Sequence, residues 1–227
     1  MAAKRGIITA GVFICLMLAV FICSAACAET ITAIATPVNP EHLEKTACCA
    51  RVLGFNEVRN TLTVELIVPE IFDAEEVREL EVGDAIYTGG EEVLIRTIDW
   101  YEDDGYLVIN AGTYEHAPGS VYLHRERWGN YMANRYGHPT YNTLAVLDCP
   151  VTDNLLFLDY ISEGSGDALE LPIVSTAAEL VEMIRSIEES RRTKGRYMIG
   201  LDIDNVCVVF DGNGQLAVVQ RFFVSWQ

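Results

Sequence analysis

The sequence lacks the short motifs by which many enzymes are recognised. It has no Gly-x-Ser-x-Gly, no His-Glu-x-x-His, no Cys-x-x-Cys and no phosphate-binding loop that ends in Lys-Ser or Lys-Thr. Gly212-x-Gly214-x-x-Ala217 superficially resembles a dinucleotide fingerprint. A strand-like segment follows it, however, and not the helix that would receive a pyrophosphate. No cofactor is implied.

Basic residues are scarce as well. The chain has 16 Lys and Arg against 33 Asp and Glu, and its formal net charge is −17. Residues 1–28 hold two of the bases and none of the acids, which leaves 14 bases against 33 acids and a formal charge of −19 for the rest. Such a charge repels nucleic acid and anionic membrane surfaces, and it favours solubility or basic partners. We therefore exclude a nucleic-acid role.

The N-terminus has the layout of an export signal. Lys4 and Arg5 precede an apolar run over 7–23 and then small residues. Ala26-Cys27-Ala28 fits the small-x-small rule of signal peptidase, so residues 1–28 are predicted to be removed. Two alternatives stay open: lipidation of Cys27 at an imperfect lipobox, and an uncut anchor, since the run is close to the ~20 residues that span a bilayer. All three place the body outside the cytoplasm, secreted or held in the cell envelope through the leader or a lipid on Cys27.

Four cysteines follow the leader, at Cys48, Cys49, Cys149 and Cys207. An oxidising compartment permits disulfides between them. Because adjacent Cys48 and Cys49 would close a strained ring, two pairings remain, and both tie the start of the body to positions 149 and 207. The alternative is that these are buried free thiols, as the apolar surroundings of Cys207 suggest.

Turn signals and hydrophobic alternation predict a β-rich α+β fold. Residues 29–45 contain two prolines and no period, and are predicted to be a linker. Residues 46–127 combine short strands, a helical turn capped by Asp73 and an Asp104-Gly105 hairpin, which is typical of a small antiparallel β-barrel or roll. Residues 143–227 are predicted to form an α+β domain, with a further strand over 197–203 and a hairpin through 211–214.

One helix is predicted clearly, over about 176–192. Thr176 and Glu179 have the spacing of a capping box, and Leu180, Ile184 and Ile187 form an apolar stripe. The strands that follow it, over 197–203, 205–210 and 215–224, are continuous apolar runs, which indicates burial on both faces. We expect this helix to pack on an antiparallel sheet.

The segment 125–142 is the candidate binding surface. It concentrates arginines and aromatic residues in an acidic chain, lies between the two predicted domains, and has neither a helical nor a strand period, so a loop is predicted over 128–142. Aromatic faces beside planar donors suit a glycan, a peptide or a protein partner. The candidate ligand-binding residues are Arg125, Arg127, Trp128, Tyr131, Arg135, Tyr136, His138 and Tyr141.

We therefore predict an exported, non-catalytic binding or interaction module. One alternative is an exported hydrolase with dispersed catalytic residues, for which His124, His138, Asp202 and Asp204 are the candidates. Another is a membrane-anchored structural protein, in which the aromatic residues of the loop hold the two halves together. The spacings of His116, His124 and His138 match no zinc motif, and no metal site is predicted.

Overall fold

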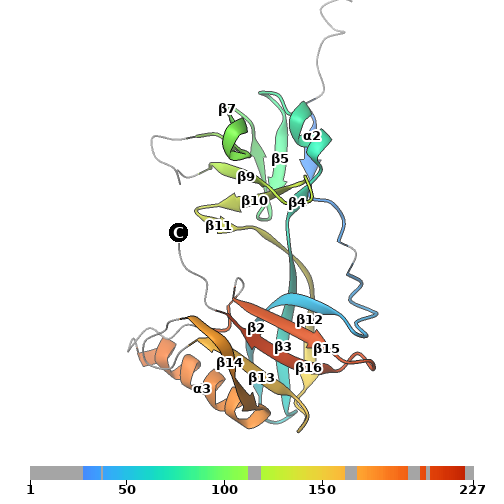
Figure 1. Cartoon of the computed structure of the whole chain (residues 1–227), viewed down its shortest axis with the longest axis vertical. Coiled ribbons are helices and arrows are strands. Elements are labelled where there is room, and N and C mark those ends of the chain that lie inside the picture. Colours follow the sequence, from blue (N-terminus) through green and yellow to red (C-terminus); the bar gives the residue numbers. More distant parts are fainter. Residues whose placement is uncertain are drawn as a thin grey trace, which may run out of the picture.

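The computed structural model describes residues 28–36, 38–111, 119–161, 168–193, 200–202 and 205–222. The predicted leader through Cys27, His116, Asp204 and most of the predicted strand 197–203 lie outside the described residues. No described helix is long and apolar enough to cross a membrane. The described chain forms two lobes joined by a neck (Figure 1).

The large lobe, residues 38–69 and 141–222, is built on a seven-stranded sheet. Its strands are β2 (Ala47–Asn56), β3 (Thr61–Pro69), β12 (Tyr141–Pro150), β13 (Leu156–Ile161), β14 (Ala168–Thr176), β15 (Val206–Phe210) and β16 (Leu216–Arg221). They lie in the order β12-β3-β2-β15-β16-β13-β14. Neighbours are antiparallel, except that β13 and β16 run parallel.

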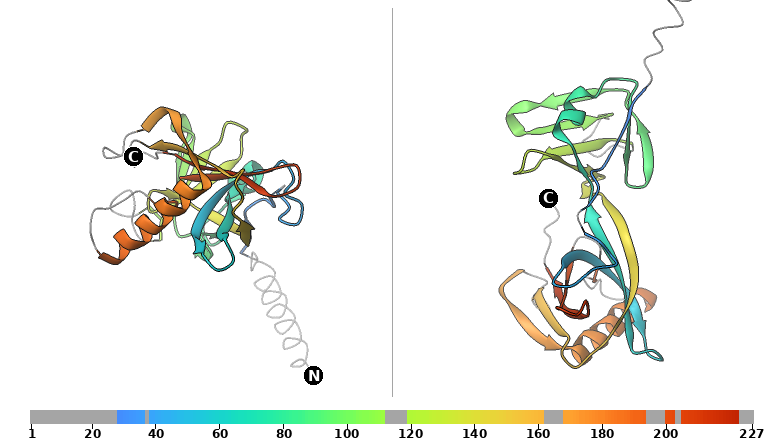
Figure 2. Two further views of the ribbon diagram at one scale, coloured as in Figure 1. Left: turned by 90° about the horizontal axis from the view of Figure 1, so that it is seen from below. Right: turned by 90° about the vertical axis from the view of Figure 1, so that its right-hand side faces the viewer.

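Helix α3 (Ala177–Thr193) covers one face of this sheet (Figures 1 and 2), as the sequence predicts. The Thr176 N–H donates to Glu179 Oε2 at 2.7 Å, and the Glu179 N–H reaches Thr176 Oγ1 at 3.4 Å, so the capping box is present. The predicted stripe of Leu180, Ile184 and Ile187 is buried in the core of the lobe. The capping box and the apolar stripe, both read within one short segment, are therefore sufficient to predict this helix.

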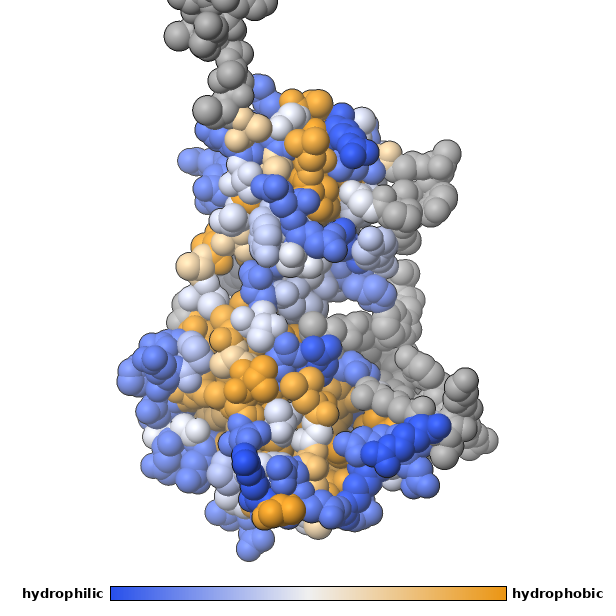
Figure 3. Space-filling model, turned by 180° about the vertical axis from the view of Figure 1, so that it is seen from behind, coloured by the Kyte–Doolittle hydropathy of each residue, from blue (hydrophilic) through white to orange (hydrophobic). Residues whose placement is uncertain are grey.

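The opposite face of the large-lobe sheet is only partly covered. The alternation of each strand turns Val146, Leu156 and Val174 away from α3, and all three are exposed. Figure 3, seen from behind, shows apolar residues gathered over this lobe. On β15, for which burial on both faces is predicted, Cys207 and Val209 are only partly buried on this face.

The small lobe comprises residues 28–32 and 71–139. Its three-stranded sheet has the order β1-β5-β6, and its six-stranded sheet has the order β11-β10-β9-β8-β7 with β4 beside β10. The strands are β1 (Thr30–Thr32), β4 (Ile71–Phe72), β5 (Ala85–Thr88), β6 (Glu91–Leu94), β7 (Ile98–Tyr101), β8 (Tyr106–Ile109), β9 (Val121–Arg125), β10 (Tyr131–Arg135) and β11 (His138–Pro139). Helix α2 (Ala74–Glu79) begins at Asp73, whose carboxylate accepts from two backbone N–H groups, and the 3-10 turn η1 spans Glu102–Asp104.

Each lobe has its own apolar core. Two crossings lie side by side in the neck, from β3 to β4 at Glu70 and from β11 to β12 at Thr140 (Figure 2). The sequence predicts that β2 and β3 belong to the domain of residues 46–127, whereas in the structure β2 pairs with β15 and β3 with β12. Within the predicted linker 29–45, β1 pairs in parallel with β5, and Leu43 is buried in the large-lobe core.

The β-rich α+β class is confirmed, but the barrel or roll is not supported, because none of the sheets formed by the described residues closes on itself. The predicted loop 128–142 contains β10 and β11. These strands are too short for a recognisable period, and the turns at Gly129 and Gly137 dominate the sequence signal. Their inward-facing members, Tyr131 and Ala133, are buried.

Candidate binding site

The candidate segment 125–142 is divided between the two ends of β10. Arg125 ends β9, and Arg127 and Trp128 lie in the β9–β10 turn, at one end of β10. Tyr136 and His138 lie at the β10–β11 turn, and Tyr141 begins β12. The predicted site is therefore two separate regions.

The end of β10 at the β9–β10 turn gathers residues from two hairpins. Tyr106 of β8 lies opposite both Tyr101 of β7 and His124 of β9, and His124 lies opposite Met132 of β10. The Arg125 N–H donates to the Gly105 carbonyl at 2.8 Å. The β7–β8 turn and the β9–β10 turn are consequently neighbours, and we call their shared end the aromatic tip. It comprises Trp100, Tyr101, Tyr106, His124, Arg125, Arg127, Trp128 and Tyr131.

On one face of the aromatic tip, three rings form a continuous row. The Tyr101 and Tyr106 rings are stacked with centroids 4.6 Å apart and planes 15° apart, and the His124 ring follows 5.6 Å from Tyr106. Tyr101, at the outer end, is 43% exposed. The row is thus held by its own stacking and presents a ring to solvent.

On the other face and at the turn, two tryptophans are accessible. Trp100 is 40% exposed and meets buried Tyr131 edge to face, with ring centroids 6.4 Å apart. Trp128 is 88% exposed, and the Arg127 guanidinium lies 5.8 Å from its ring centroid. Exposed large rings gathered in this way are uncommon on a soluble surface and mark interaction sites.

Charge at the aromatic tip is mixed. Arg125 and Arg127 are exposed beside Glu126, and Asp103 and Asp104 occupy the neighbouring turn. Burial lowers the pKa of His124, and the Glu126 carboxylate opposes this in part. A neutral imidazole at pH 7 has one donor and one acceptor nitrogen, so the tip offers polar partners of both kinds.

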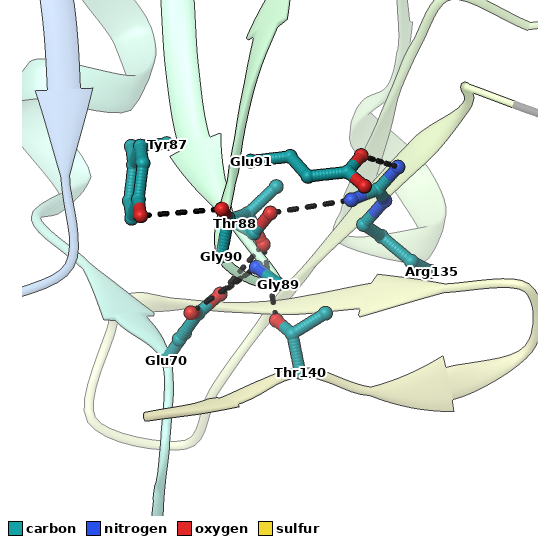
Figure 4. A network of polar contacts seen from close by, with 8 residues as sticks. All are labelled: Glu70, Tyr87, Thr88, Gly89, Gly90, Glu91, Arg135 and Thr140. Atoms are coloured by element: carbon teal, nitrogen blue, oxygen red, sulfur yellow. Dashed lines mark hydrogen bonds and ion pairs between the residues drawn. The ribbon is translucent and has the colours of Figure 1, made fainter. Parts of the chain in front are cut away.

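At the neck end of β10, Arg135 has a structural role. Its Nη1 donates to the Thr88 carbonyl at 3.3 Å, and its Nη2 lies 3.1 Å from a Glu91 carboxylate oxygen (Figure 4). Its guanidinium carbon lies 5.5 Å from the Tyr136 ring centroid. Its side chain is mostly buried. These contacts leave little of the guanidinium for a ligand.

Glu70 is the centre of the same network in the neck. The Glu70 carboxylate, in a residue only 1% exposed, accepts from Thr88 Oγ1 at 2.6 Å and from the Gly89 N–H at 3.0 Å (Figure 4). The Thr88 hydroxyl lies 3.1 Å from the Thr140 hydroxyl, which donates to the Ala133 carbonyl. The network thus links the β5–β6 turn to both crossings of the neck. It fastens the small lobe to the neck with polar groups, whereas Trp128 and Tyr136 are both exposed.

The hydrolase candidates are not brought together. His124 lies at the aromatic tip and His138 at the opposite end of the same sheet. Asp202 lies in the large lobe, where the neighbouring Leu201 carbonyl accepts from the Val52 N–H of β2. Within the described residues, no group of three His, Cys, Asp or Glu side chains could hold a metal ion.

Sequence reasoning missed Trp100, Tyr101 and Tyr106. All three belong to the segment "DWYEDDGY", which was assigned only as a hairpin. Aromatic residues on both sides of an Asp-Gly turn were the available signal, because a hairpin places them opposite each other. The register that joins this hairpin to β9 is not readable from the sequence.

No protein-family model, curated protein or solved structure matches this chain.

Proposed function

We propose that this protein is an exported, non-catalytic binding module and that the aromatic tip binds a carbohydrate. The observation that carries the proposal is the pair of accessible tryptophans, Trp100 and Trp128, on two adjacent hairpins. Export is supported by the leader, with Lys4 and Arg5 ahead of its apolar run.

The chemistry of the aromatic tip suits a sugar better than a long peptide. A pyranose ring has an apolar C–H face that packs on an aromatic ring, and its hydroxyl rim needs donors and acceptors at the edge of that ring. Arg125 and Arg127 supply donors, and Asp103 and Asp104 of the neighbouring turn supply acceptors. An extended peptide bound by strand addition would instead require a long free strand edge.

The test is a glycan array probed with the full chain, with Trp100→Ala and Trp128→Ala as loss variants and Tyr136→Ala as the matched control. Tyr136 is an exposed aromatic at the other end of β10, so it reports the effect of losing any surface ring. We expect at least a tenfold weaker affinity for each loss variant, since central aromatic contacts commonly contribute about 2 kcal/mol or more. The control should bind as wild type.

Each variant is checked for an unchanged Tm, so that lost binding is not lost folding. Equal weakening in Tyr136→Ala would refute the aromatic tip as the site. If no glycan binds and a peptide array gives a hit that Trp128→Ala abolishes, the tip is a peptide site and the carbohydrate assignment is wrong.

A further inference from the structure

Cys49 and Cys207 are direct cross-strand partners at the centre of the large-lobe sheet. Cys49 on β2 lies opposite Cys207 on β15, and both side chains are partly exposed. Their neighbours Cys48 and Val208 are buried in the core beneath α3. Alternation along each strand therefore turns both thiols to the face away from the helix.

The two residues form a non-hydrogen-bonded pair. The Phe210 N–H donates to the Thr46 carbonyl at 2.9 Å, which makes residues 210 and 46 a hydrogen-bonded pair of the β15–β2 ladder. Counting three residues along each strand makes Cys207 and Cys49 a non-bonded pair. In such pairs the Cα atoms are about 4.5 Å apart and the side chains are closest, within the roughly 4.4–6.8 Å that a disulfide spans.

The ladder on the other side of β15 agrees. The Phe222 N–H of the β16 end donates to the Asn205 carbonyl at 2.8 Å, so the hydrogen-bonded pair two residues further along is Cys207 with Gln220. The backbone N–H and C=O groups of Cys207 thus point toward β16, and only its side chain lies against Cys49.

Cys149 lies too far from Cys48 and Cys49 to form a disulfide with either. Cys149 lies on β12, which β3 separates from β2, and its partner on β3 is Leu62, whereas the partner of Cys49 on β3 is Ile67. Five residues of strand put Cys149 roughly 17 Å away along β3. Cys149 is consequently out of reach of Cys49 and Cys48, which removes both two-disulfide pairings left open by the sequence.

We propose that Cys49 and Cys207 form a single cross-strand disulfide when the protein meets a low-molecular-weight disulfide such as oxidised glutathione. One thiolate attacks the oxidant, forms a mixed disulfide and releases one glutathione. The second thiolate then attacks the protein sulfur and releases the other glutathione. Two protein thiols are oxidised, the S–S bond of the oxidant is reduced, and the two protons end on the two glutathione thiols.

This crosslink joins the N-terminal hairpin of the large lobe to its C-terminal hairpin. It closes a loop of about 160 residues, a length for which restriction of the unfolded chain is large. Burial raises the pKa of both thiols, and since the thiolate is the reacting species, oxidation accelerates as the pH rises.

The experiment treats the full chain with excess oxidised glutathione at pH 7 and pH 9, blocks the remaining thiols, and maps linked peptides by mass spectrometry. Because Cys48 and Cys49 share a peptide, fragmentation of the wild-type linked peptide assigns the cysteine, and Cys48→Ala is the matched control for Cys49→Ala. The expected product is a 49–207 link that persists in Cys48→Ala and in Cys149→Ala, and is absent from Cys49→Ala.

We further expect oxidation to be at least tenfold faster at pH 9 than at pH 7, and Tm to rise by roughly 5 °C or more on oxidation. A link from Cys207 to Cys48, a link that involves Cys149, or no link in the folded wild-type protein would each overturn the proposal. The mapping on wild-type protein decides the outcome even if an alanine variant fails to fold.

Discussion

The buried ion pair of Asp159 and Arg221 should be the most sensitive point of the large lobe. Arg221 Nε lies 2.9 Å from Asp159 Oδ1, Nη2 lies 2.5 Å from Oδ2, and the two side chains are 7% and 4% exposed. They sit opposite each other on the parallel strands β16 and β13, and Asp159 Oδ1 also accepts from the Ile161 N–H at 3.1 Å. Removal of one partner leaves the other charge buried.

Arg221→Met deletes the guanidinium while it keeps most of the aliphatic volume. Breaking a buried pair in this way costs about 3–5 kcal/mol, which for a protein of this size lowers Tm by roughly 6–20 °C. The double variant Asp159→Leu with Arg221→Met removes both charges, and we expect it to recover most of the loss, because well-packed apolar residues often replace a buried pair without cost.

The assay is urea unfolding followed by circular dichroism, and Arg59→Met is the matched control. Arg59 pairs with Asp148 at 3.4 Å on the surface of the same sheet, with side chains 69% and 46% exposed, so its loss should cost no more than about 1 kcal/mol. If Arg221→Met is no more destabilising than Arg59→Met, the assumption that this pair lies in a dry interior is wrong.

Three further outcomes are expected. Gly89→Ala should lower Tm by several degrees, because Gly89 has φ +59° and an added Cβ would lie 3.3 Å from Arg135 Nη1 in the neck; Gly90→Ala has the same backbone strain without the contact and should cost less. Burial holds the pKa of His124 below its ordinary value of 6.5, so the contribution of this neutral side chain to stability is complete above pH 6.5 and is lost as the pH falls through the pKa of the folded state. An NMR titration of His124 should show a midpoint below 6.5, and a midpoint at or above 6.5 would contradict its burial. If the leader is cut after Ala28, the new α-ammonium of Glu29 replaces the N–H that donates to Asp84 Oδ1 at 3.0 Å, and Asp84→Asn should then lower Tm more in the cut chain than in the uncut chain; equal losses would show that the charge contributes nothing.

Local chemistry explains which elements could be predicted from the sequence. Helix α3 is predictable because its capping box and apolar stripe lie within a dozen residues, and the Asp104-Gly105 turn likewise joins strands that are adjacent in sequence. Pairings between distant strands, such as β2 with β15, follow from the competition of many apolar strands for neighbours. For this reason the boundaries of the two lobes differ from the domain boundaries predicted from the sequence.

The candidate site could likewise be predicted only where its residues are close together in the sequence. Trp128 and the arginines beside it were predicted from composition, and the structure leaves Trp128 exposed. The tyrosines that complete the aromatic tip come from a hairpin about 20 residues earlier, which only the register of β8 and β9 brings alongside. In the sequence Arg135 is equivalent to the other arginines, but the acceptors around it belong to residues 44 and 47 positions away.

The register of β3 and β12 gives the small lobe the character of an insertion. Pro69, the last residue of β3, lies opposite Tyr141, the first residue of β12, so the two strands leave the large lobe as the two arms of one hairpin. The whole of residues 70–140 occupies the position that a two-residue turn would fill. The seven-stranded sheet is topologically complete without it, so residues 70–140, which carry the aromatic tip, could be exchanged without altering a single strand pairing in the large lobe.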